Sequence, residues 1–212
     1  MLNTEVTGTG LIADTHGRVS ALSKAIEALA LKNIYNLIHL GDFFDSAYRE
    51  KLSEVLLILQ NHQILAVKGN NDYQVEKMLE RDYGYEFRHQ KETCLAFLKK
   101  TPIFYVSGNT CFSHSMPYHS IRSFYEPIDT GTTEKASDLF EKTLHHVLFC
   151  GHSHRPVFFR YAAGKVTREE IFPGRKVSIN LHERYIFIVG SAENGDCGLY
   201  NKEQSFYERI VF

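Results

Sequence analysis

A short apolar run near the start of the chain, Leu11 to Ala13, ends directly at Asp14-Thr15-His16. A strand that stops at such a turn leaves a carboxylate and an imidazole side by side at a sheet edge, where the pair can hold a metal ion. Four later apolar runs also end in polar groups. These groups are Gly41-Asp42, Gly69-Asn70-Asn71-Asp72, His114 and Gly151-His152-Ser153-His154. We therefore expect a fold that organises these strand ends around the first pair.

The first third of the chain alternates strand and helix patterns. Apolar residues recur at helical spacing over 19–29 and 52–59, and these segments separate strand-like runs that end near residues 13, 40 and 67. This βαβαβ order is typical of a parallel sheet with helices on its faces, and ligands bind beyond the carboxyl ends of such strands. The candidate residues at those ends are Asp14, His16, Asp42 and Asn70.

The rest of the chain is less regular. Helical patterns at 73–78 and 94–99 precede a predicted hairpin whose second strand ends at His114. Residues 115–133 are polar and aromatic without a clear period, and a long loop that starts beside a candidate ligand indicates a rim or lid. Six short strand patterns from Val157 onward predict a largely antiparallel second sheet. No linker, repeat or low-complexity segment is evident, so we expect residues 1–212 to form a single domain.

Composition limits the kinds of partner. The chain has 212 residues, 43% of them hydrophobic, which is enough for a proper core, and a net charge of -1. This balance gives no basic field for nucleic acid or an anionic membrane, and we expect neither as a partner. No charged leader precedes a long apolar stretch, and no run approaches the roughly 20 apolar residues of a membrane span, which favours the cytoplasm. Four widely spaced cysteines predict buried free thiols.

Taken together, the polar blocks resemble the motifs of the calcineurin-like metallophosphoesterases over nearly the whole chain. The blocks, in the order of that family, are Asp14-x-His16, Gly41-Asp42-x-x-Asp45, Gly69-Asn70-x-Asp72, His114 and Gly151-His152-x-His154. The resemblance implies an α/β fold, a four-layer α/β/β/α sandwich of two mixed sheets flanked by helices, with a two-metal site between the strand ends. A late Gly190-Ser191 pair looks like the family's glycine-serine turn near the site, although Val189 precedes it where compact members have proline.

The resemblance also implies roles for individual residues. One metal is expected on Asp14, His16 and His154, the other on Asn70, His114 and His152, and Asp42 is expected to bridge both. Mixed oxygen and imidazole ligands suit Mn, Fe, Zn, Co or Ni better than Mg²⁺ or Ca²⁺, and manganese is the metal we favour. A bound metal can lower the pKa of water from about 15.7 to about 7, which supplies a nucleophile for in-line attack on phosphorus.

One position departs from the phosphatase branches of the family. Their Gly-Asn-x-Asp block has a histidine third, which contacts substrate and helps the leaving group depart, whereas this chain has Asn71. Asparagine can donate a hydrogen bond to a phosphoryl oxygen but cannot transfer a proton at neutral pH. The compact phosphodiesterase-like branch, with cysteine or asparagine there, matches better. Asp72 is expected to orient its neighbours, and His119, Tyr118 or Arg122 in the loop after His114 is the candidate proton donor or phosphate clamp.

The sequence therefore predicts a dinuclear-metal phosphoesterase, foremost a phosphodiesterase acting on a small or nucleotide-like substrate. Two alternatives stay open. The first is a protein Ser/Thr or nucleotide phosphatase, which Asn71 disfavours. The second is a non-catalytic metal-binding scaffold, which the complete set of seven ligand positions disfavours.

Overall fold

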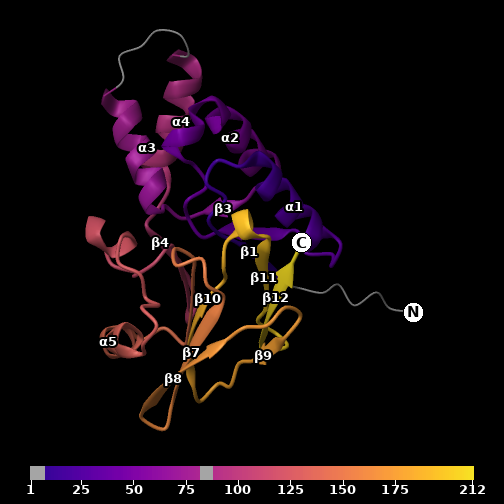
Figure 1. The fold of residues 1–212 in the computed structure, drawn as a ribbon, viewed down its shortest axis with the longest axis vertical. Helices are drawn as coiled ribbons and strands as arrows, with labels where there is room; N and C mark the ends of the chain where they lie inside the picture. Colours follow the sequence, from indigo (N-terminus) through magenta and orange to yellow (C-terminus); the bar gives the residue numbers. More distant parts are fainter. Residues whose placement is uncertain (1–7, 82–87) are drawn as a thin grey trace.

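The computed structural model describes residues 8–81 and 88–212, which form two six-stranded sheets with helices around them (Figure 1). The first sheet has the strand order β3-β2-β1-β11-β12-β9. Its strands are β1 (Thr9–Ile12), β2 (Asn36–His39), β3 (Leu65–Ala66), β9 (Lys176–Ser178), β11 (Asp196–Asn201) and β12 (Phe206–Val211). β1, β2 and β3 are parallel and are joined through α1 (Val19–Ala30), η1 (Ser46–Lys51) and α2 (Leu52–Asn61), which confirms the predicted βαβαβ order.

The second sheet has the strand order β4-β5-β6-β10-β7-β8. Its strands are β4 (Phe104–Ser107), β5 (Thr110–Ser113), β6 (Val147–Cys150), β7 (Val157–Ala162), β8 (Lys165–Glu170) and β10 (Arg184–Ile188). β4 and β5 form the predicted hairpin, β6 lies parallel to both β5 and β10, and β7 and β8 complete the sheet antiparallel. Both sheets are therefore mixed, as expected.

The prediction that the last third of the chain forms a largely antiparallel second sheet was wrong. β7, β8 and β10 belong to the second sheet, but β9, β11 and β12 extend the first, where β11 pairs with β1. The chain crosses between the sheets before β9, after β9 and again after β10, the last time at Gly190-Ser191 and η3 (Ala192–Asn194). There the Ala192 amide donates to the Ala13 carbonyl at 2.8 Å, and Ser191 Oγ donates to the Asp14 carbonyl at 3.0 Å.

Alternation of side chains along the strands creates the layers. In β6, Val147 and Phe149 face the core between the sheets, whereas Leu148 and Cys150 face the opposite side. β10 follows the same rule, as period-two side-chain geometry requires. Because both faces of these strands are buried, their sequences read as continuous apolar runs rather than alternating ones.

Helices close the two outer faces. α1, α2, α3 (Asn70–Arg81) and α4 (Arg88–Lys100) gather on one side of the molecule and share a core with the outer face of the first sheet (Figure 1). The second sheet is covered by α5 (Glu134–Lys142), which buries Ala136, Leu139 and Phe140 against it. This is the expected four-layer α/β/β/α sandwich. α5 has only nine residues, and no sequence pattern predicted it.

Residues 115–133, expected as a rim or lid, form an ordered segment over the outer face of the second sheet. Met116 and Ile128 are buried in the same core as α5, and a turn of 3-10 helix, η2 (Ile121–Phe124), interrupts the segment. All four cysteines are buried free thiols, as predicted. Among the described helices, none has the length and apolarity needed to cross a bilayer.

Candidate metal centre

The predicted ligands come from both sheets and meet at one end of the sandwich. Asp14 and His16 follow β1, Asp42 follows β2, and Asn70 begins α3, all on the side of the first sheet. His114 follows β5, and His152 and His154 follow β6 of the second sheet. The ligand atoms form two groups, and within each group all of them lie within 4.8 Å of one another. The first group comes from Asp14, His16 and His154, and the second comes from Asp14, Asp42 and His114.

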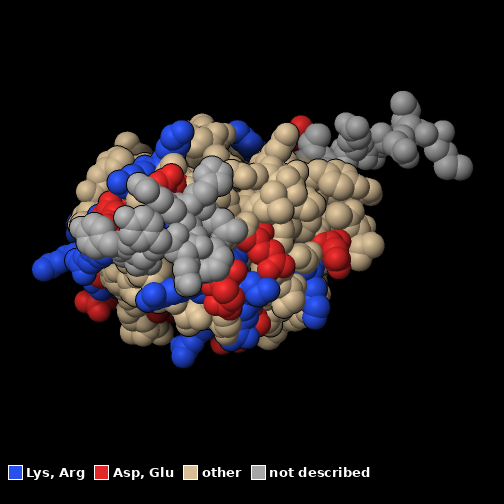
Figure 2. Space-filling model, turned by 90° about the horizontal axis from the view of Figure 1, so that it is seen from above, with Lys and Arg blue, Asp and Glu red and all other residues tan. Residues whose placement is uncertain are grey.

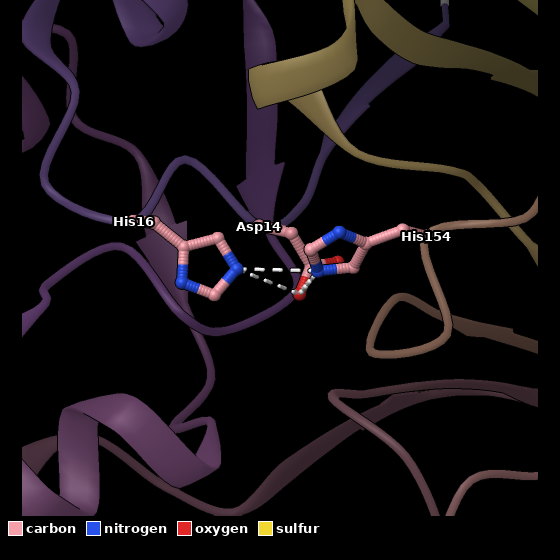
Figure 3. Close-up of side chains that lie close together, drawn as sticks. All are labelled: Asp14, His16 and His154. Carbon is pink, nitrogen blue, oxygen red and sulfur yellow. Dashed lines mark hydrogen bonds and ion pairs between the residues drawn. The ribbon is translucent and has the colours of Figure 1, made fainter.

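The first group surrounds a buried carboxylate oxygen of Asp14. Figure 3 shows the imidazoles of His16 and His154 pointing toward this oxygen from opposite sides. Asp14 Oδ1 has no hydrogen-bond partner among the described residues and lies 3.3 Å from His154 Nε2 and 3.8 Å from His16 Nε2. The two Nε2 atoms are 3.2 Å apart. The other oxygen, Oδ2, accepts a hydrogen bond from the His152 amide at 2.9 Å, which fixes the carboxylate.

The second group is built around His114, which is fully buried. Its Nδ1 lies 3.0 Å from the Leu40 carbonyl, and a carbonyl can only accept, so Nδ1 carries a proton, and in the singly protonated tautomer Nε2 is bare. This Nε2 faces Asn70 Oδ1 at 3.0 Å, His152 Nδ1 at 3.1 Å and Asp42 Oδ2 at 3.5 Å. His152 Nε2 in turn donates to the Tyr125 carbonyl at 3.2 Å, which leaves its Nδ1 bare too.

These contacts fit bound cations. Around His114, its Nε2 faces two atoms with lone pairs, Asn70 Oδ1 and His152 Nδ1, at hydrogen-bond distance, and with Nε2 bare this arrangement is repulsive unless a positive charge lies among them. In the first group, a buried carboxylate oxygen lacks a partner within the described chain, which is costly for the same reason. Mixed imidazole, amide and carboxylate donors suit first-row transition metals.

The backbone at the site is held in an uncommon conformation. Five of the seven candidate ligands have positive φ angles, between 47° and 70°: Asp14, His16, Asp42, His152 and His154. Non-glycine residues rarely adopt this left-handed region, and each such residue costs about 1–3 kcal/mol. The described chain has nine non-glycine residues with positive φ, so more than half are candidate ligands, and strain concentrated in this way is typical of a functional site.

Residues 8–189 match the family model described as the calcineurin-like phosphoesterase superfamily domain. The chain belongs to this superfamily. It is accordingly a phosphoric ester hydrolase, as predicted from its motifs. No curated protein matches the chain significantly.

Solved structures share the fold of this phosphoesterase. A metallophosphoesterase from Sphaerobacter thermophilus has 20% identity and a TM-score of 0.73, with 97% of this chain and 88% of that chain covered. An archaeal phosphodiesterase has 19% identity and a TM-score of 0.52, with 97% and 100% covered. A putative diadenosine tetraphosphatase has 13% identity and a TM-score of 0.52, with 100% and 96% covered.

Two glycines of the phosphoesterase allow the strand ends to approach one another. A Cβ on Gly69 would lie 2.1 Å from Asp42 Oδ1, and one on Gly151 would lie 2.3 Å from Asp14 Oδ2. Both distances are far inside van der Waals contact, so any side chain at either position would displace a candidate ligand. Glycine is therefore required at both positions by close packing.

Asn71 and Asp72 lie beside the ligands and hold Asp42. The Asn71 amide nitrogen donates to Asp42 Oδ1 at 2.8 Å, and its side-chain Nδ2 donates to Oδ2 at 2.7 Å. Asp72 is fully buried and accepts from the amides of Asp42, Phe44 and Gly69 at 2.7–2.9 Å. Asp72 thus has the orienting position that was predicted, while the Asn71 side chain is directed to Asp42.

His119 and Arg122 do not contact the candidate metal ligands. His119 is exposed and its ring packs on Phe104 at a centroid distance of 4.7 Å, and Arg122 is exposed in η2. Neither side chain forms a hydrogen bond, ion pair or ring contact with the seven candidate ligands, all of which the structure describes. The loop instead reaches the site through the Tyr125 carbonyl, and a backbone acceptor leaves no signal in a sequence.

Asp45 contacts the site as well as starting a helix. Its Oδ2 lies 3.4 Å from His16 Nδ1, and its Oδ1 accepts from the Ala47 amide at 2.8 Å as the N-cap of η1. The side chain therefore both contacts a candidate ligand and caps η1. The carboxylate favours the proton on His16 Nδ1, which leaves Nε2 free to face Asp14.

Burial and charge set the protonation of the cluster. Burial lowers the pKa of His152 to about 4, so its ring is neutral at pH 7. The neighbouring Asp14 raises the pKa of His154. Burial acts to raise the pKa of Asp14, but His154, His114 and His16 together outweigh it and lower that pKa, so the carboxylate stays ionised.

Proposed function

We propose that this phosphoesterase is a dinuclear-metal phosphodiesterase that hydrolyses a small or nucleotide-like phosphoester. The observation that carries the proposal is the Asn71 side chain, which donates to Asp42 at the position where phosphatase branches place a proton-transferring histidine. Since the amide cannot transfer a proton at neutral pH, this position does not supply the acid that a monoester with a poor leaving group needs.

In the proposed site, Asp14, His16 and His154 would hold one metal, Asn70, His114 and His152 would hold the other, and Asp42 would serve both. Manganese is the favoured metal. Bound metals would supply a nucleophile at neutral pH and stabilise charge on the phosphoryl oxygens. The convergence of bare nitrogen and oxygen atoms described above supports this assignment.

Other residues of the chain would position the candidate ligands. Asn71 and Asp72 fix Asp42, and Asp45 fixes the tautomer of His16. Tyr125 and Leu40 fix the rings of His152 and His114 through their carbonyls. We also propose that residues 1–212 act as one domain, because side chains of both sheets share the core between them.

Two other functions remain as outcomes of the test. A protein or nucleotide monoester phosphatase would need a proton donor other than Asn71. A non-catalytic scaffold would bind metal without turnover.

Metal analysis and a paired assay separate these possibilities. The purified protein is expected to contain about two metal ions per chain and to hydrolyse bis-p-nitrophenyl phosphate faster than p-nitrophenyl phosphate. Metal without turnover of either compound would support a scaffold. Faster turnover of the monoester would support a phosphatase and overturn the proposal.

A further inference from the structure

A groove of about 640 Å³ runs along α3 beside the candidate metal centre. Its lining includes Tyr73, Lys77 and Arg81 of α3, Arg49 of η1 and Tyr125 of the loop after β5. This volume lies within the range of small-molecule binding sites. None of these side chains has a role in the metal centre.

The groove is continuous with the site at two points. α3 begins at the candidate ligand Asn70, and Tyr73, Lys77 and Arg81 follow at a spacing of four residues, on one face of the helix. The Tyr125 carbonyl contacts His152, and the rings of Tyr73 and Phe124 lie 5.5 Å apart. With a rise of about 1.5 Å per residue, the path from Asn70 to Arg81 is roughly 16 Å long.

The lining of the groove includes two arginines, Arg49 and Arg81, and Arg81 lies at the end of α3 that is far from Asn70. Lys77 is paired with Glu80 at 2.8 Å and lies 3.8 Å from Glu76, so its charge is offset. Among the described residues, neither Arg49 nor Arg81 has a carboxylate partner. Figure 2 views the molecule from the α3 and α4 end, and the part of this face that is drawn in colour shows basic and acidic side chains interspersed.

Two aromatic rings, of Tyr73 and Tyr125, line the groove together with the arginines. Tyr73 is partly buried, and the Lys77 ammonium lies over its ring, 5.3 Å from the ring centroid. Tyr125 is 40% exposed, so its ring is available for stacking. Aromatic faces stack on nucleobases with little dependence on which base is present, and guanidinium groups pair well with phosphate.

We propose that this groove binds the nucleoside arm of a phosphodiester substrate, and that this arm carries a second phosphate. The scissile phosphate would lie at the metal centre, the base along Tyr73 and Tyr125, and the second phosphate at Arg49 and Arg81. This inference rests on the proposed function and narrows its substrate class to nucleotides with two separate phosphates.

Three chromogenic diesters with the same leaving group test the proposal. They are bis-p-nitrophenyl phosphate, thymidine 5'-(p-nitrophenyl phosphate) and the 3'-phosphate of the latter, and each releases p-nitrophenol. We expect kcat/KM to rise in that order. The 3'-phosphate is expected to raise kcat/KM in the wild type, and the double variant R49A/R81A is expected to reduce that increase about tenfold. Each exposed ion pair with the phosphate contributes up to about a fivefold effect on binding. Tyr125→Ala is expected to reduce the increase in kcat/KM that the nucleoside gives over bis-p-nitrophenyl phosphate.

Lys24→Ala is the matched control, because Lys24 is an exposed cation on α1 outside the groove, and it should leave all three values as in the wild type. If the wild type hydrolyses the small diester but gains nothing from the nucleoside or the 3'-phosphate, the groove proposal is overturned and the phosphodiesterase stands. The groove proposal is likewise overturned if R49A/R81A keeps the full gain.

If the wild type hydrolyses none of the three compounds, the proposed function fails, and binding then decides the groove. Calorimetric titration with thymidine 3',5'-bisphosphate would support the groove if the wild type binds it and R49A/R81A weakens the Kd about tenfold. Equal binding by both proteins, or no binding by the wild type, would overturn it.

Discussion

Asp42 receives more support than any other candidate ligand. Both of its oxygens accept from Asn71, and its own amide donates to Asp72. In Asp42→Ala we expect loss of bound metal and a fall in diesterase activity of more than about 100-fold, because the carboxylate proposed to serve two ions is gone. Metal content and kcat/KM are the measurements. Asp138→Ala, which removes an exposed carboxylate on α5, should change neither, and near-normal turnover in Asp42→Ala would contradict the bridge.

Asn71 offers a direct test of leaving-group chemistry. In Asn71→His we expect the ratio of monoester to diester turnover to rise at least about tenfold for monoesters with poor leaving groups, because a proton donor is restored. Diester turnover should fall, since the 2.7 Å hydrogen bond from the side-chain amide to Asp42 is lost. Steady-state rates on alkyl monoesters and on bis-p-nitrophenyl phosphate give the ratio. An unchanged ratio would mean that another group already donates the proton.

At the scale of residues, the sequence was informative wherever a motif ended a strand. Asp14, His114 and His154 could be predicted to converge, because strand ends share a sheet edge. The direction of the Asn71 side chain could not be predicted, since it depends on the Asp42 carboxylate placed beside it by a different strand. His119 and Arg122 lie in a segment whose path is set by packing on the second sheet, so their proximity in sequence to His114 carried no information on position.

At the scale of elements, an ion pair between Asp129 and Arg168 connects the segment 115–133 to β8. Arg168 donates from two nitrogens to the two oxygens of Asp129, at 2.8 and 2.9 Å. Burial acts to raise the pKa of Asp129, but Arg168 outweighs it and the pKa lies below its ordinary value. A carboxyl with a lowered folded-state pKa stabilises the protein at pH values above its unfolded pKa, and this stabilisation is lost as the pH falls through the folded value.

Asp129→Asn should therefore destabilise the protein by about 2 kcal/mol at pH 7, and the difference from the wild type should shrink below roughly pH 4. Urea unfolding at pH 7 and pH 3 measures both values. Glu126→Gln is a control in the same segment, because it breaks only the exposed pair with Lys135 and should have little effect at either pH. A pH-independent difference would assign the loss to packing and not to the charge.

The division of strands between sheets was the part of the fold that local patterns could not give. Both sheets bury one face in the same central core, to which Tyr200 and Tyr207 contribute from the first sheet and Phe149 and Phe187 from the second. A strand whose sequence is largely apolar can therefore belong to either sheet and still bury one face in this core. For β11 the choice was made by the last crossing, at Gly190-Ser191, whose hydrogen bonds to the end of β1 bring β11 alongside that strand.

At the scale of the whole molecule, the metal centre joins the two sheets. The His152 amide donates to Asp14, and the rings of His16 and His154 meet across the gap, so each proposed metal has ligands from both sheets. Without cations, the bare nitrogen and oxygen atoms repel one another, and five ligands keep a strained backbone. Bound metal should consequently stabilise the entire fold and not only the site.

We therefore expect Mn²⁺ to raise the unfolding temperature of metal-free protein. At a free concentration about 100 times the Kd, the stabilisation is about 2.7 kcal/mol, which corresponds to roughly 5–10 °C for a chain of this size. Calorimetric scans of protein treated with a chelator, with and without added Mn²⁺, measure the shift. His154→Ala removes a ligand supplied by the second sheet and should show a smaller shift, whereas Asp138→Ala should keep it. If the wild type unfolds at the same temperature in chelator and in Mn²⁺, the ligands do not converge on a cation, and the dinuclear assignment fails.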